Sequence, residues 1–141
     1  MSADVKKVQT TQALVESLWQ FWRRWRRASH PVIKGKITPE QYWLLMRLKK
    51  AGTLKVSELA QGLGITNSSA TIATKRLEKL GLVSRVRQQS DERVVALSLT
   101  PEGVAALEQW SDEKREALTE LISPLTAKEQ EQLLRLLEKI L

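Results

Sequence analysis

The clearest chemical pattern in the chain lies between Thr66 and Gly81, where the residue spacing predicts one helix with two unlike faces. One face carries apolar residues at helical spacing and is expected to meet a core: Ala70, Ala73, Leu77 and Leu80. The other face carries hydroxyls, one aliphatic side chain and cations, without a carboxylate: Ser68, Thr71, Ile72, Lys75 and Lys79. A face that offers hydrogen-bond donors and positive charge, with little bulk near its start, suits the major groove of DNA.

The neighbouring segments are expected to position this helix. Residues 56–63 predict a shorter helix and residues 62–65 a tight turn, so that a helix-turn-helix results whose second helix begins near Thr66. Two strand patterns and the polar turn between them follow directly: residues 82–87, 88–92 and 93–99. Two strands in this position, directly after such a helix, form a wing.

Hydroxyl and proline residues mark the ends of the other expected helices. Thr38 and Thr100 each precede a proline, which is a strong signal for a helix start. Thr126 and Glu129 have the spacing of a capping box ahead of the last helix. We expect residues 1–10 to be frayed. Four further helices are expected over residues 11–29, 39–51, 101–123 and 127–141.

The first and last of these helices carry more apolar surface than a single contact usually needs. The first helix has one apolar stripe with a second beside it: Leu14, Leu18, Phe21 and Trp25, then Val15, Trp19 and Trp22. The last helix has six branched aliphatic residues between Leu133 and Leu141. Because exposed apolar surface of this kind normally finds a partner, both helices suggest contact with another subunit.

The basic, tryptophan-rich run from Trp19 to Arg27 has a second interpretation as a helix that lies at a membrane interface. The simpler interpretation is a core or interface helix whose arginines reach solvent, because the aromatic residues belong to an otherwise core-like domain. No apolar run approaches the ~20 residues of a membrane span, and no signal peptide is evident. We therefore expect a cytoplasmic protein without a membrane partner.

Length and charge fit one domain with a polyanionic partner. The 141 residues carry a formal net charge of +7, distributed as +6 over residues 1–37, +5 over residues 38–100 and −4 over residues 101–141. The lack of cysteine and the single histidine, His30, argue against disulfides, metal sites and a Ser-His relay. No nucleophile elbow, phosphate loop or paired catalytic carboxylates are visible, so we expect no enzyme activity and no cofactor.

Three sequence blocks together resemble the MarR (multiple antibiotic resistance regulator) family. The blocks are Glu58-Leu59-Ala60, the run from Leu77 to Arg85, and Asp91-Glu92-Arg93 followed by Leu97-Ser98-Leu99-Thr100. The resemblance implies a mainly α fold with a small β-wing, in which a winged helix-turn-helix lobe over residues 38–100 is flanked by dimerisation helices within residues 1–37 and 101–141. It further implies a homodimer that represses pseudopalindromic operators and is released by a small aromatic or anionic ligand.

Candidate DNA contacts follow from the two-faced helix and the wing. Major-groove contacts are expected from Ser68, Thr71, Ile72 and Lys75, with Asn67 and Ser69 near the edge. Phosphate contacts are expected from Arg76, Lys79 and Arg85, and further wing contacts from Arg87, Asp91 and Arg93. Arg93 is the candidate for insertion into the minor groove, oriented by Asp91; a local Asp–Arg turn pair is the alternative. The alternative is that these helix residues only cap and solvate a surface helix.

One position departs from the family pattern. Members often have a basic residue directly after the threonine of the recognition helix, where this chain has Ile72 after Thr71. An exposed isoleucine can contact a thymine methyl but cannot bond guanine, so base preference should shift toward A·T.

Several aromatic residues are candidates for an effector pocket: Trp19, Trp22, His30, Tyr42, Trp43 and Met46. Aromatic residues at helical spacing are more often ordinary core. A second class of function is also open, in which a ligand-free winged helix serves as an architectural or protein-docking module. A specificity ratio near one between operator-like and random DNA would favour that class.

Overall fold

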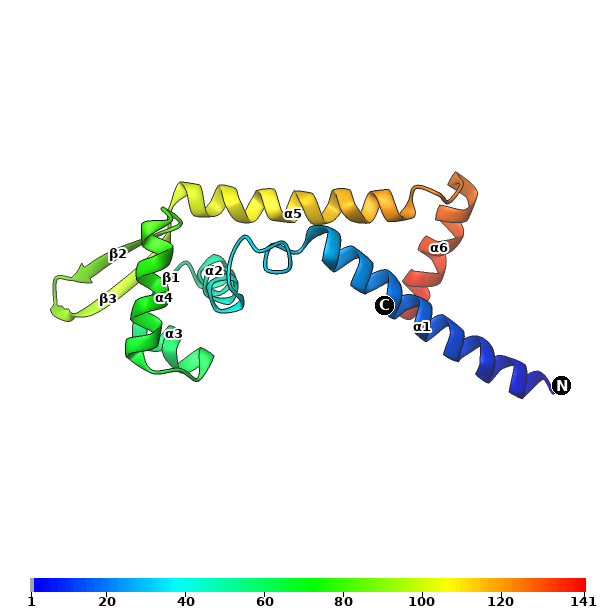
Figure 1. Cartoon of the computed structure of the whole chain (residues 1–141), viewed down its shortest axis with the longest axis horizontal. Helices are drawn as coiled ribbons and strands as arrows, with labels where there is room; N and C mark the ends of the chain where they lie inside the picture. Colours follow the sequence, from blue (N-terminus) through cyan, green and yellow to red (C-terminus); the bar gives the residue numbers. More distant parts are fainter. Residues whose placement is uncertain (1) are drawn as a thin grey trace.

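The computed structural model describes residues 2–141, except for the side chains of Gln88, Asp91, Glu92 and Arg93. Six helices and a three-stranded sheet follow one another along this part of the chain (Figure 1). In order they are α1 (Ala3–Ser29), α2 (Pro39–Ala51), β1 (Thr53–Lys55), α3 (Val56–Leu63), α4 (Asn67–Lys79), β2 (Val83–Gln88), β3 (Asp91–Leu99), α5 (Pro101–Ile122) and α6 (Ala127–Ile140). The β2–β3 wing lies at one end of the molecule and the N terminus of α1 at the other, with α5 running between the two ends.

Hydroxyl side chains cap five of the helices, because the first N–H groups of a helix have no partner within it. The capping box expected at Thr126 is present, and a second one lies at Thr38, where the sequence predicted a helix start. Thr38 accepts from the backbone N–H of Gln41 at 3.2 Å, and the Gln41 side chain accepts from the backbone of Thr38 at 3.1 Å. Thr126 and Glu129 repeat this exchange at the start of α6, at 3.2 and 2.9 Å. The helix starts were therefore correctly predicted at both positions.

Gly64 makes the tight turn of the helix-turn-helix possible. Its φ of +68° lies in the left-handed region, which a residue with a Cβ adopts only at a cost. The turn is closed by the backbone N–H of Ile65, which donates to the carbonyl of Ala60 at 3.0 Å. Thr66 then caps α4 by accepting from the backbone N–H of Ser69. The second helix thus begins where the sequence predicted.

The wing strands pair antiparallel in the order β1-β3-β2. Leu54 of β1 and Arg85 of β2 both lie opposite Leu97, which is fully buried. The strands of the hairpin extend further than the sequence indicated, since β2 reaches Gln88 and β3 begins at Asp91. The expected five-residue turn is therefore reduced to residues 89–90.

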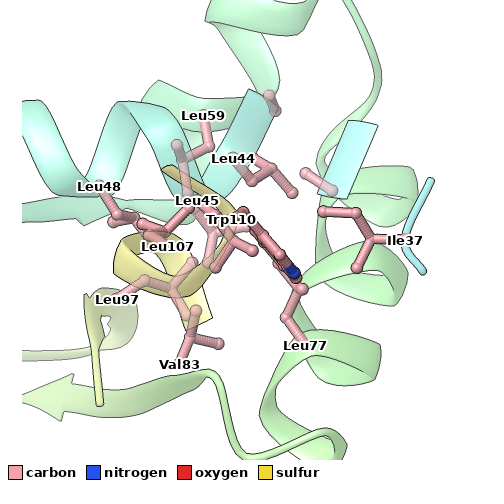
Figure 2. Close-up of a cluster of buried hydrophobic side chains, with 13 residues drawn as sticks. Ile37, Leu44, Leu45, Leu48, Leu59, Leu77, Val83, Leu97, Leu107 and Trp110 are labelled. Carbon is pink, nitrogen blue, oxygen red and sulfur yellow. The ribbon is translucent and has the colours of Figure 1, made fainter. Parts of the chain in front are cut away.

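The core of the lobe formed by residues 38–100 joins residues that precede and follow the wing in the sequence (Figure 2). It comprises mainly large aliphatic side chains: Leu44, Leu45, Leu48, Leu59, Leu77, Val83, Leu97, Leu107 and Trp110. Leu107 and Trp110 come from α5, so the first half of that helix belongs to the core of the lobe. The boundary of the lobe expected at residue 101 coincides with the start of α5. The core of the lobe nevertheless continues past this boundary into the first half of α5.

Two expectations about individual segments were wrong. Residues 3–10 are helical rather than frayed, because Ser2 caps α1 and accepts from the backbone N–H of Val5 at 3.3 Å. Leu80 is 58% exposed rather than in the core, because it is the C-cap of α4 and the helix ends before it turns inward. The fourth inward position is taken by Thr74, which is buried and donates to the carbonyl of Thr71 at 3.0 Å.

Helices α1 and α6 leave most of their apolar side chains exposed in the single chain. The exposed aliphatic and aromatic residues of the two helices are Val5, Val8, Leu14, Val15, Leu18, Trp19, Trp22, Leu134, Leu136, Leu137 and Ile140. The C-terminal part of α1 is nevertheless fixed to α5, because the indole Nε1 of Trp25 donates to the carbonyl of Lys114 at 2.8 Å.

Candidate nucleic-acid interface

Helix α4 has one buried face and one exposed face. Ala70, Thr74 and Leu77 are buried against the lobe. The exposed residues of the helix are Asn67, Ser68, Ser69, Ile72, Lys75, Arg76, Glu78 and Lys79. Thr71 is half-buried. Of the residues predicted to meet the major groove, Ser68, Ile72 and Lys75 therefore lie outward, and Thr71 lies toward the side.

Ser69 belongs partly to the cap of α4. Its backbone N–H donates to the hydroxyl of Thr66 at 3.1 Å, and the Thr66 hydroxyl in turn donates to the hydroxyl of Ser69 at 3.0 Å. The cap was foreseen from the sequence only as a start near Thr66. This contact holds the first turn of α4 rigid and directs the Ser69 side chain back toward the turn.

Glu78 is the only carboxylate on α4, whose residues 67–79 are all described, and its charge is balanced by Arg85. The two side chains approach to 3.8 Å between Glu78 Oε2 and Arg85 Nε. The Arg85 side chain is only 16% exposed, since it lies on β2 opposite Leu97. Arg85 thus joins α4 to the wing, a role that the sequence did not indicate. With Glu78 balanced, the outward face of α4 is left with the charge of its cations.

A hollow of about 190 Å³ separates α4 from the wing and from the start of α3. Its lining residues are Lys55, Val56, Ser57, Asn67, Thr71, Arg85, Val94 and Val95. The Nε atom of Arg85 is buried without a hydrogen-bond partner, and no side chain caps the N terminus of α3. The hollow therefore combines an amide, hydroxyls and cationic groups beside the candidate DNA-binding face.

The wing residues are only partly described. Arg87 is exposed on β2 and lies opposite Val95 of β3. Asp91 and Arg93 lie at the start of β3, but their side chains fall outside the described residues. The expected minor-groove role of Arg93 and the orienting role of Asp91 therefore stay predictions.

A second hollow, of about 140 Å³, lies where α1 meets α5. It is lined by Trp22, Trp25, Arg26, Ser29, His30 and Lys114. Two of the aromatic residues expected at an effector pocket, Trp22 and His30, are among them. Tyr42 lies directly behind: its ring centroid is 4.9 Å from that of His30, and its hydroxyl accepts from Lys114 Nζ at 2.6 Å.

The other three candidates for the effector pocket are not part of this lining. Trp19 contacts Trp22 edge to face on α1, with ring centroids 5.5 Å apart. Trp43 contacts Arg47 and Gly62, and Met46 is exposed on α2. The sequence missed Trp25, Arg26, Ser29 and Lys114 as lining residues. Of these, Lys114 could have been identified from the sequence. It lies among the apolar positions of the helix over residues 101–123, and a charged residue there requires a specific partner.

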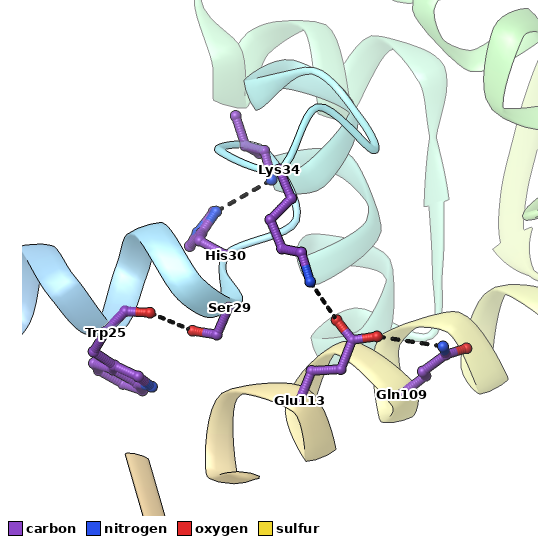
Figure 3. Close-up of polar contacts among 7 residues, drawn as sticks. Trp25, Ser29, His30, Lys34, Gln109 and Glu113 are labelled. Carbon is purple, nitrogen blue, oxygen red and sulfur yellow. Dashed lines mark hydrogen bonds and ion pairs between the residues drawn. The ribbon is translucent and has the colours of Figure 1, made fainter. Parts of the chain in front are cut away.

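Figure 3 shows the polar contacts of His30 and of Glu113 beside the second hollow, whose own lining includes the cationic side chains of Arg26 and Lys114. The backbone N–H of Val32 donates to His30 Nδ1 at 3.3 Å. Burial, followed by the charges of Lys114 and Arg26, lowers the pKa of His30 below its usual value and so favours the neutral ring. The nearby carboxylate, Glu113, faces Lys34 at 3.8 Å and accepts from Gln109 Nε2 at 3.3 Å.

The described residues contain no group of three or more His, Cys, Asp or Glu side chains arranged to hold a metal ion. In the same part of the chain, no helix combines the length and the apolar character needed to cross a membrane.

Comparison with known proteins is consistent with this geometry. The family model described as MarR family matches residues 37–95. HTH-type transcriptional repressor MdtR of Bacillus subtilis is 38% identical over 96 residues, which are 68% of this chain and 62% of MdtR, so less than two thirds of that relative is spanned. The homoprotocatechuate degradative operon repressor of Escherichia coli is 31% identical over 112 residues, covering 79% of this chain and 76% of that repressor.

Solved structures agree over nearly the whole length. The crystal structure of YusO from Bacillus subtilis has 30% sequence identity and a TM-score of 0.72, covering 99% of this chain and 97% of YusO. A mutant of Escherichia coli MarR in complex with operator DNA has 25% identity and a TM-score of 0.56, covering 100% and 99%. The fold and the two-faced helix α4 define a winged helix-turn-helix protein. The chain belongs to the MarR family, whose curated members include transcriptional repressors.

Proposed function

We propose that this protein is a dimeric, sequence-specific repressor that binds pseudopalindromic operators in double-stranded DNA. The observation that supports it most directly is the outward face of α4, where Ser68, Ile72 and Lys75 are exposed and the single carboxylate of the helix is balanced by Arg85. A helix that offers small polar groups and cations fits the major groove. The relatives named as repressors support the same function.

The exposed apolar residues of α1 and α6 support the homodimer. Both helices lie at the end of the molecule away from the wing, where a second copy can cover them without blocking α4 (Figure 1). A two-fold pair would then place its two α4 helices in successive major grooves on one side of a duplex, about 34–36 Å apart. An operator with two-fold symmetry follows from this arrangement.

Phosphate contacts would come from the cations around α4. Arg76 and Lys79 are exposed on its last turns. The hollow beside Arg85 offers further hydrogen-bond donors, which in the proposed complex would lie close to the DNA phosphates. Such contacts fix the register of the protein on DNA without reading its sequence. Arg93 remains the candidate for the minor groove beside the wing.

DNA binding is tested with duplexes selected from a random pool, measured against unselected duplex at several salt concentrations. We expect a clear specificity ratio, and we expect Arg93→Ala to cost about 1–3 kcal/mol of specific affinity. Lys79→Ala should instead flatten the salt dependence by about one ion and affect all sequences alike. A specificity ratio near one would favour the architectural or protein-docking alternative, and an unchanged isotherm for Arg93→Ala would exclude the wing contact.

The second hollow is proposed as the site at which a small aromatic or anionic ligand releases DNA. Indole rings of Trp22 and Trp25 supply an apolar wall, and Arg26 and Lys114 supply positive charge. Its position between α1 and α5 lets a bound molecule alter how the chain ends meet the lobe. Tryptophan fluorescence and operator release are to be measured together across a panel of aromatic acids. No quenching and no release across the panel would contradict this part of the proposal.

A further inference from the structure

The charges of α4 are unevenly distributed along its length. Residues 67–73 include no charged side chain, whereas Lys75, Arg76 and Lys79 lie in the second half of the helix. In a helix-turn-helix the N-terminal residues of the second helix meet the base edges, and later residues lie nearer the backbone. If the chain binds DNA as proposed above, neutral side chains meet its bases.

Most of these neutral side chains are already engaged or turned aside. Asn67 and Thr71 line the hollow that faces the wing. The hydroxyl of Ser69 accepts from Thr66 within the cap. Ala70 is buried in the core. In the first half of α4, Ser68 and Ile72 are the described side chains that remain directed outward without such an engagement.

Ile72 is an unusual residue to expose at this position. Its side chain is 54% exposed, and it has no donor or acceptor with which to bond a base. Ser68, one turn before it, and Arg76, one turn after it, place it in the middle of the outward face. Of the four bases, thymine alone presents a methyl group in the major groove. Guanine is recognised chiefly by arginine or lysine, which the first half of α4 lacks.

We infer that Ile72 determines base preference by packing against the 5-methyl group of thymine, so that each half-site carries an A·T pair opposite this residue. This inference rests on the proposed DNA binding and adds the base that is read and the chemical group that is recognised. Deoxyuridine lacks only that methyl group and pairs as thymine does. Replacing thymine by deoxyuridine therefore removes the proposed contact and leaves hydrogen bonding unchanged.

The test uses the full-length protein and a duplex that it selects from a random pool. Each thymine of the selected half-site is replaced by deoxyuridine in turn, and binding is measured for wild type, Ile72→Ala and Ile72→Val. For wild type we expect one position at which the replacement weakens binding about fourfold per half-site, as for re-exposing one methyl-sized group to water. Ile72→Ala should lose most of this sensitivity, and Ile72→Val should keep part of it.

Ile33 supplies a matched control, because it is also an isoleucine, is 47% exposed and lies in the loop before α2. Ile33→Ala should retain the full effect of deoxyuridine. Loss of affinity by Ile72→Ala that is equal for thymine and deoxyuridine duplexes would overturn the inference, as would a wild-type protein that ignores the replacement at every position. Failure of the wild-type protein to select any sequence would instead contradict the proposed sequence-specific function itself.

Discussion

The lobe around α4 buries its large apolar side chains, whereas the two ends of the chain leave most of theirs exposed. Within the lobe, Leu44 and Leu45 are completely buried, and α2, α3, α4, β2, β3 and α5 all contribute to one core. Along α1 and α6, residues such as Leu18 and Leu137 remain 56% and 40% exposed in the single chain. The lobe, together with the first half of α5, therefore buries its own apolar residues, whereas those at the ends of the chain would be covered only in the proposed homodimer.

Exposed apolar residues in the two regions therefore indicate two different kinds of partner. At the chain ends, exposed apolar residues are numerous and adjacent, which is typical of a protein interface. On α4, Ile72 is a single aliphatic residue among hydroxyls and cations, which is typical of a surface that meets a polar partner. Mutations in each region should therefore affect different measurements.

Removing core volume from the lobe should have the largest effect. Leu45→Ala is expected to lower the free energy of unfolding by about 2–5 kcal/mol, because it leaves a cavity at a fully buried position. Leu80→Ala is the matched control, since the same side chain is lost from a site that is 58% exposed. Denaturant unfolding measures both. Equal losses at the two positions would contradict the assigned boundary of the core.

Breaking the proposed subunit contact should have the next largest effect, on binding rather than on folding. Leu18→Glu places a charge on the exposed apolar face of α1, and we expect monomers that bind operator DNA roughly 100-fold or more weakly. Gln20→Glu adds the same charge about 200° around the helix and should have little effect. Sedimentation and binding isotherms distinguish the two. A Leu18→Glu protein that stays dimeric would rule out this face as the interface.

A smaller loss is expected where α5 starts against the base of the wing. A Cβ added at Gly103 would collide with the backbone carbonyl of Leu82, so Gly103→Ala should cost about 1–3 kcal/mol of unfolding free energy. At Gly62 the added Cβ would meet the ring of Trp43 at 2.7 Å. A half-buried side chain can move aside more easily than backbone, so Gly62→Ala should cost less. Thermal unfolding of both variants tests this order, and a larger loss for Gly62→Ala than for Gly103→Ala would contradict it.

The smallest effect concerns His30. Because the folded state lowers its pKa, the unfolded chain binds the proton more readily, and acidification favours unfolding through this group. Its stabilisation is present above pH 6.5, begins to fall near that value and is lost below the lowered pKa of the folded state. Unfolding free energies measured across this range should therefore fall less steeply with acidification for His30→Gln. Identical slopes in the two proteins would contradict this assignment.

Much of the fold could be predicted from local signals, because caps and turns act within a few residues. Thr38, Thr66, Thr100 and Thr126 mark helix starts that the structure reproduces. Leu80 shows where such signals stop, since periodicity continues past the residue at which the helix ends.

The contacts around α4 and around the second hollow were harder to predict, because contacts between distant segments produce no periodic pattern in the sequence. Glu78 and Arg85 belong to adjacent elements but come together only through the packing of α4 on the wing. Lys114 meets Tyr42 across 72 positions of sequence, and Trp25 meets Lys114 across 89. Ser68, Ile72, Lys75 and Lys79 of α4 were correctly placed outward because their direction depends on the geometry of one helix alone, whereas Thr71 is half-buried beside the wing.

Helix α5 touches each functional part of the molecule in turn. Its first turn contacts Leu82 at the base of the wing, and its middle, at Lys114, is bonded to Trp25 and Tyr42. From Lys114 to Gly103 the helix is about 17 Å long, so that it acts as a stiff lever arm. Pivoting it by about 10° at Lys114 swings the far end by about 3 Å. That travel is close to the ~3.4 Å step between stacked bases, so for the ligand proposed above a small rotation of α5 would be enough to change the fit of the wing to DNA.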